Sequence, residues 1–88
     1  MLLNVVYACA LPEHRVLLRF EDGLEGVVDL GTLNFSGVFA PLANPTYFAK
    51  LRVDPDLGTI AWPNGADLDP DVLYSKVLAK RASPYTET

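Results

Sequence analysis

The sequence predicts an α+β domain: an antiparallel β-meander of about five strands, with one short helix and one C-terminal helix packed on the sheet. Three observations carry this prediction. Apolar and polar residues alternate with a period of two along residues 14–20. The turn Glu21-Asp22-Gly23 follows at once. Residues 69–81 begin with an aspartate that can cap a helix and a proline that suits its first position, and then show apolar residues at helical spacing.

The length of 88 residues suits one domain and is too short for two. We place this domain at residues 1–82 and expect residues 83–88 to form a flexible C-terminal tail. Half of the residues are hydrophobic, and the mean hydropathy of +0.19 is high for so small a chain. Apolar side chains should therefore remain on the surface, which favours a homodimer or a partner protein.

Charge and cysteine content exclude several classes of function. Seven Lys and Arg residues against eleven Asp and Glu residues give a net charge of −4. An acidic domain repels phosphate backbones, which argues against direct nucleic-acid binding. Cys9 is the only cysteine, and a lone free thiol is typical of the cytoplasm. No stretch approaches the roughly 18 apolar residues needed to span a membrane.

The first two strands are expected at residues 2–10 and 14–20, separated by a break at Pro12. A two-residue loop of Leu11 and Pro12 would make Cys9 and His14 cross-strand neighbours, and a thiol beside an imidazole is the beginning of a cysteine nucleophile. A working site also needs an orienting group and an oxyanion hole. The competing interpretation is a small strand residue and a surface histidine, and we predict no catalytic residues.

The second hairpin has a register that the side chains select. With Gly23 in the left-handed position of a three-residue loop, arginines meet carboxylates on one face and apolar residues meet on the other. A two-residue loop of Asp22 and Gly23 would instead set Val16 against Asp29. The predicted opposing pairs are Phe20 with Leu24, Arg19 with Glu25, Val16 with Val28, and Arg15 with Asp29.

The middle of the chain should hold a loop, one helical turn and two short strands. Residues 31–41 are expected to be mostly loop. Asn44 is a helix N-cap, and Pro45 suits the first helical position of a turn ending near residue 50. Strands are predicted at residues 51–54 and 59–62.

The C-terminal helix begins at Asp69-Pro70, where the aspartate caps the first turn and the proline starts it. We expect it to end near Arg81. The apolar stripe predicted to face the sheet consists of Leu73, Tyr74, Val77 and Leu78.

Carboxylates near this helix raise the question of a metal site. Asp67, Asp69 and Asp71 have the spacing of the first three ligands of a calcium loop. Such a loop also needs glycine at its sixth position and glutamate at its twelfth, where this chain has Val72 and Leu78. Helix capping explains the aspartates, and we predict neither a metal nor a cofactor.

Aromatic residues are the candidate contacts for a partner, because they make good interface anchors. We select Phe39, Tyr47 and Tyr85, and expect Trp62 to belong to the core. A basic stripe that could bind nucleic acid would form only if the strand holding Arg15 and Arg19 adjoined the one holding Lys50 and Arg52.

Three segments together resemble a known family. They are Phe20-Glu21-Asp22-Gly23, the Val-Asp-Leu at 28–30, and Trp62-Pro63-Asn64-Gly65-Ala66-Asp67-Leu68-Asp69-Pro70. The chain is similar to the bacterial family called domain of unknown function 2442. The resemblance implies a small α+β domain without established catalytic residues, in which these motif residues are structural. It also implies a partner encoded by an adjacent gene, in the manner of a toxin–antitoxin pair.

We therefore expect a non-enzymatic regulatory or protein-interaction module, antitoxin-like in a two-gene pair. Two alternatives remain open at this point. One is an accessory domain of a DNA-binding transcriptional regulator. The other is a small ligand-binding or thiol-based enzyme domain that uses Cys9 and His14.

Overall fold

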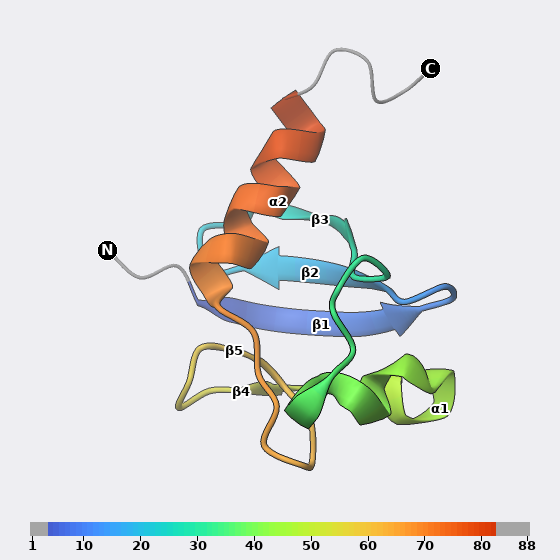
Figure 1. The fold of residues 1–88 in the computed structure, drawn as a ribbon. Helices are drawn as coiled ribbons and strands as arrows, with labels where there is room; N and C mark the ends of the chain where they lie inside the picture. The colour runs from blue at the N-terminus through green and yellow to red at the C-terminus, as the bar shows by residue number, and fades with distance from the viewer. Residues whose placement is uncertain (1–3, 83–88) are drawn as a thin grey trace.

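The computed structural model describes residues 4–82, with side chains through Lys80. Five strands in two antiparallel sheets, together with helices, confirm the predicted α+β class (Figure 1). The elements are β1 (Val5–Leu11), β2 (Arg15–Phe20), β3 (Glu25–Asp29), the 3₁₀ helix η1 (Gly37–Ala43), α1 (Pro45–Phe48), β4 (Arg52–Asp54), β5 (Thr59–Ala61) and α2 (Pro70–Ala82). One sheet has the order β1-β2-β3 and the other pairs β4 with β5.

The β2–β3 hairpin has the predicted register throughout. Arg19 opposes Glu25, and Arg15 opposes Asp29. The Phe20 amide donates to the Leu24 carbonyl at 2.8 Å. Gly23 has a φ of +94°, which a side chain rarely tolerates, so the three-residue glycine loop is confirmed.

The charged pairs on this hairpin differ from each other. Arg19 and Glu25 form an ion pair at 3.4 Å. The Arg15 guanidinium instead donates through Nε to the Pro12 carbonyl at 3.0 Å. Asp29 accepts from the Gly31 amide at 2.8 Å. Both arginines therefore lie in register with carboxylates, but only Arg19 is ion-paired with its partner among the described residues.

The β1–β2 turn is not the two-residue loop of Leu11 and Pro12 that would have paired Cys9 with His14. Leu11 pairs with Arg15, which leaves Pro12, Glu13 and His14 in the loop. Glu13 and His14 have φ values of 64° and 59°, in the left-handed region. Cys9 of β1 therefore lies opposite Leu17 of β2, so Cys9 and His14 are not cross-strand neighbours.

The core lies between the β1–β3 sheet, α2 and the second layer. The sheet contributes alternate, fully buried side chains: Val16, Leu18, Phe20, Val28 and Leu30. Gly26 of β3 lies directly under the helix, because a Cβ placed there would be 2.9 Å from Cγ1 of Val77. This glycine allows α2 to approach β3 closely.

The predicted stripe of α2 is correct for its first turns and wrong at Leu78. Leu73 and Val77 are buried, and the half-buried Tyr74 ring lies 4.9 Å from the Phe20 ring. Leu78 is 45% exposed. It lies five residues after Leu73, or about 140° around the helix axis, and so faces away from the sheet.

The second layer is built from β4, β5, η1 and α1 below the sheet in Figure 1. Asn44 caps α1 as predicted, since its side chain accepts from the Thr46 amide at 2.8 Å. The segment predicted as loop at 31–41 contains the start of η1, which buries Leu42. Its 3₁₀ geometry with an internal proline gives no helical periodicity for a sequence pattern to reveal.

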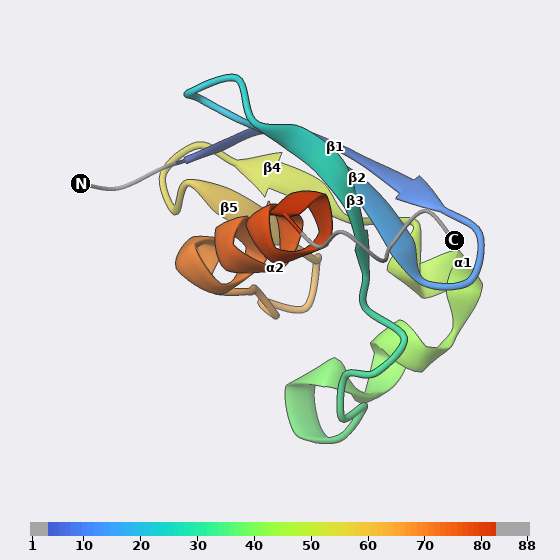
Figure 2. The ribbon, with the colours of Figure 1, turned by 90° about the horizontal axis from the view of Figure 1, so that it is seen from above.

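The helices and the second layer all lie on one side of the β1–β3 sheet (Figure 2). The opposite side is formed by the odd-numbered residues of the strands from Tyr7 onward, which are half-buried or exposed, whereas Val5 lies before a register shift in β1 and is buried in the core. We call this side the outer face. Its residues are Tyr7, Cys9, Leu11, Arg15, Leu17, Arg19, Glu25, Val27 and Asp29.

Candidate functional site

His14 is a structural residue of the inner side of the sheet. Its Nε2 donates to the Leu42 carbonyl at 2.8 Å. Its ring packs 4.7 Å from the Phe48 ring and 5.2 Å from the Phe35 ring. Cys9 lies on the outer face, so the sheet separates the thiol from the imidazole. The pair considered for nucleophilic catalysis is not assembled.

The three aspartates around the start of α2 serve the backbone. Asp69 accepts from the Asp71 amide at 2.9 Å, which confirms it as the helix cap. Asp67 pairs through its backbone with Ala61. Within residues 4–80, no group of three or more His, Cys, Asp or Glu side chains has an arrangement that could hold a metal ion. No described helix is long and apolar enough to cross a membrane.

The Trp62-Pro63-Asn64-Gly65 segment is a second three-residue glycine turn. The Trp62 amide donates to the Ala66 carbonyl at 2.9 Å, and Gly65 has a φ of +92°. Asn64 accepts from the Ala66 amide at 3.1 Å and donates to the Val38 carbonyl at 2.8 Å. The motif therefore ties this turn to η1.

The candidate aromatic contacts have different environments. Trp62 is 1% exposed and its Nε1 donates to the Phe48 carbonyl at 3.0 Å, so the prediction that it belongs to the core is confirmed. Tyr47 and Phe39 are half-buried and pack against the core. Tyr85 lies outside the described residues.

One side-chain contact ties the β2–β3 turn to α2. The Tyr74 hydroxyl donates to the Asp22 carboxylate. This hydrogen bond, helped by the Leu24 amide, lowers the pKa of Asp22 below its usual value. The same bond raises the pKa of Tyr74, because the phenolate would face the carboxylate.

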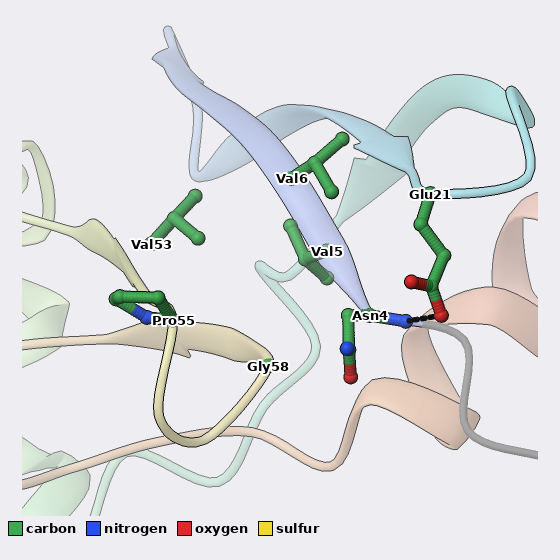
Figure 3. A pocket seen from close by; sticks show the side chains of 7 residues that line it. All are labelled: Asn4, Val5, Val6, Glu21, Val53, Pro55 and Gly58. Carbon is green, nitrogen blue, oxygen red and sulfur yellow. Dashed lines mark hydrogen bonds between the residues drawn. The ribbon is translucent and has the colours of Figure 1, made fainter.

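A cavity of about 270 Å³ lies where β1 begins beside the β4–β5 turn (Figure 3). Its lining residues are Asn4, Val5, Val6, Glu21, Val53, Pro55 and Gly58. Glu21 is the charged group of this lining, and its carboxylate accepts from the Asn4 amide at 3.1 Å. The Val5 amide donates to the Gly58 carbonyl at 2.9 Å. These polar groups are used to fix the start of β1.

A second depression, of about 260 Å³, is almost entirely apolar, and we call it the α2 groove. It is lined by Leu30, Leu33, Phe39, Asp67, Leu68, Asp69, Val72, Leu73 and Lys76. Two carboxylates and one ammonium group stand among these residues, so the charge of the groove is negative. Val72 is 49% exposed and adds an aliphatic side chain to the open side of the groove.

Phe39, which the sequence suggested as a partner contact, lines this groove, but the other apolar walls were not predicted. Leu33, Leu68 and Val72 come from three separate segments, and each is an ordinary loop or helix residue by itself. The one available signal was Val72, an apolar residue placed off the stripe that faces the sheet.

Comparison with known families gives one result for the whole fold. A family model described as "Protein of unknown function (DUF2442)" matches residues 5–79. No match was found among curated proteins or among solved structures. The matched span runs from the first residue of β1 into the last turns of α2, and it includes both glycine turns and the α2 groove. The chain therefore belongs to the DUF2442 family of proteins of unknown function.

Proposed function

We propose that this protein is a non-enzymatic interaction module that binds a small partner protein through the α2 groove, as an antitoxin-like member of a two-gene pair. The observation that carries the proposal is the groove itself. Apolar side chains converge on it from a loop, the β5–α2 connection and α2. Such depressions take anchoring side chains at protein interfaces.

The chemistry of the groove defines the partner. Leu33, Phe39 and Val72 suit one aliphatic or aromatic side chain of the partner. Asp67 and Asp69 beside them favour lysine or arginine next to that anchor. The net charge of −4 would also speed the encounter with a basic protein.

The described residues assemble neither the thiol–imidazole pair of a thiol-based enzyme nor the basic stripe of a direct DNA contact. A thiol-based enzyme needs Cys9 beside His14, and the sheet separates these residues. The basic stripe of a DNA-binding domain needs β2 beside β4, and these strands lie in different sheets. Arg19 and Arg52 are also ion-paired, with Glu25 and Asp54.

Co-expression with the product of the adjacent gene tests this proposal. We expect the two proteins to co-purify, and Val72→Arg to weaken the complex by about tenfold or more. Leu57→Arg is the matched control, because Leu57 is 52% exposed in the β4–β5 turn and lies away from the groove. Unchanged binding by a folded Val72→Arg protein would exclude the groove. Failure of the wild-type proteins to co-purify, without rescue of any growth defect, would exclude the antitoxin role.

A further inference from the structure

The outer face of the β1–β3 sheet is left open by the described elements, which lie on the other side (Figure 2). Across its middle runs an apolar row, because Cys9 opposes Leu17 and Leu17 opposes Val27. A row of Leu11, Arg15 and Asp29 lies on one side of it, and a row of Tyr7, Arg19 and Glu25 on the other.

The charges on this face are sorted by strand. Both charged outer positions of β2 are arginines, Arg15 and Arg19, and both on β3 are carboxylates, Glu25 and Asp29. The Arg19 and Glu25 side chains are 53% and 41% exposed, so their ion pair stays open to solvent. A positive column therefore runs beside a negative one, with Leu17 and Val27 between the charges.

We propose that this face binds the same face of a second copy, forming a symmetric dimer. The two-fold axis runs along the strands, between β2 and β3, so that β2 of each copy covers β3 of the other. Arg15 then meets the partner's Asp29, and Arg19 meets the partner's Glu25. Leu17 packs against the partner's Val27 at the centre. Two sheets stacked in this way lie about 10 Å apart and are rotated by about 30°.

Two other two-fold arrangements of the same faces bring like charges together. An axis along the middle of β2 places Arg15 on the partner's Arg15, and Arg19 on the partner's Arg19. An axis across the strands places Arg15 on the partner's Arg19, and Asp29 on the partner's Glu25. Like charges in contact oppose association, so the charge pattern favours the axis between β2 and β3 over these two arrangements.

Pairing through the free edge of β3 is disfavoured by the same charges. An antiparallel pair of β3 strands centred on Val27 would set Glu25 directly opposite the partner's Asp29. Like charges directly opposite destabilise a strand pair, and charged edges are a common protection against edge-to-edge association. The face, and not the edge, is the complementary surface.

The strands are short, so the dimer is expected to be weak. Two overlapping strands of about five residues give an interface near or below the roughly 1,200 Å² of the smallest standard interfaces. We expect a dissociation constant in the micromolar range, and further weakening as salt screens the arginine–carboxylate contacts. The α2 groove lies on the other side of the sheet, so this inference does not depend on the proposed function.

A charge-swap experiment tests the arrangement. One variant carries R15E and R19E, and the other carries E25R and D29R. Each variant alone is expected to be monomeric in analytical ultracentrifugation at concentrations where the wild type dimerises, because only like charges can meet. An equimolar mixture should recover the dimer, since the two faces are again complementary.

Two further measurements keep the test decisive if a swapped variant fails to fold. Dilution of the wild-type protein should shift the amide NMR signals of Leu17 and Val27, and not those of α2. L17K should abolish the dimer, whereas L57K, on an exposed turn, should retain it. A wild type that stays monomeric to about 1 mM, a mixture of folded variants that stays monomeric, or an L17K protein that still dimerises would each overturn the proposal.

Discussion

The two glycine turns share one local structure and lead to different outcomes. In each, an aromatic residue is followed after one position by Asp or Asn and then by glycine: Phe20 to Gly23, and Trp62 to Gly65. In each, the aromatic amide donates to the carbonyl four residues later, and the glycine amide donates back. The Asp22 and Asn64 side chains accept equivalent amide hydrogens, from Leu24 and Ala66.

Beyond the turns the two regions diverge. The first turn closes a ladder that continues to Arg15 and Asp29. The second is followed by one bridge, between Ala61 and Asp67, before the chain leaves for α2. Local sequence therefore determines the turn, but the residues that follow determine whether a strand pair grows from it. The next strand alternates around Val28 in the first case, whereas Asp69-Pro70 starts a helix in the second.

The largest expected loss of stability comes from replacing the aromatic residue before each turn. Both Phe20 and Trp62 are 1% exposed, so replacing either with alanine should cost about 3–5 kcal/mol of unfolding free energy. Trp62→Phe keeps most of the volume but leaves the Phe48 carbonyl without its donor, at about 1–2 kcal/mol. Urea denaturation measures all three values. A cost below about 1 kcal/mol for Trp62→Ala would contradict the buried position.

The glycines should behave as equivalents. Gly23 and Gly65 have φ values of 94° and 92°, and nothing lies within 4 Å of an added Cβ at either. Substitution by alanine should therefore cost about 1–2 kcal/mol at each, from backbone strain alone. Gly26→Ala is the contrasting control, because its cost would come from contact with Val77. A difference above about 1 kcal/mol between Gly23→Ala and Gly65→Ala would show that the turns are not equivalent.

Exchanging the amide and the acid between the two turns should have smaller effects on stability. Asn64→Asp keeps an oxygen for the Ala66 amide but loses the donor to the Val38 carbonyl, so we expect a loss of about 0.5–1.5 kcal/mol. Asp22→Asn retains an oxygen for the Leu24 amide but replaces the oxygen that accepts from the Tyr74 hydroxyl. Both groups are exposed and water can take the place of the lost acceptor, so the effect should be smaller. Thermal unfolding of both proteins decides the order, and the reverse order would refute this assignment.

The smallest expected effect is a pH dependence found at the first turn only. The folded-state pKa of Asp22 is lowered by the Tyr74 hydroxyl, so its contribution is present above the unfolded pKa of about 3.9 and is lost as pH falls through the folded value. The pKa of Tyr74 is raised, so its contribution is present below about pH 10 and is lost as pH rises through the folded value. Tyr74→Phe should reduce the loss of unfolding free energy at both low and high pH, as measured by urea denaturation over a range of pH values. If the dependence of stability on pH at low pH is unchanged in this variant, the contact does not form in solution.

Much of the fold could be predicted because its signals are local. Alternation and opposite charges fixed the β2–β3 register, and the Asn44 and Asp69 caps located both helix starts. The β1–β2 turn carried no such signal. Its loop holds two left-handed residues that are not glycine, Glu13 and His14, and the His14 side chain bonds to Leu42, which lies 28 positions further along the chain.

The candidate site was less predictable than the fold. Phe39 was predicted as a partner contact, but the groove that it lines exists only because residues 30–39, the β5–α2 connection and α2 converge. Leu78 was assigned to the stripe facing the sheet, although its angular position on α2 places it in solvent. Surfaces made from distant segments leave no pattern in any single segment.

The bond from His14 to the Leu42 carbonyl has a consequence for the order of folding. The β2–β3 hairpin is held by neighbouring residues, whereas the first turn is held by a bond to η1, so we expect that turn to reach its final form after η1 has docked. In pulse-labelling hydrogen exchange, the Phe20 amide, bonded to Leu24, should gain protection early. The Leu30 amide, bonded to the His14 carbonyl, should follow later. The β1–β2 turn would then reach its final form after the β2–β3 hairpin, although its residues come earlier in the chain.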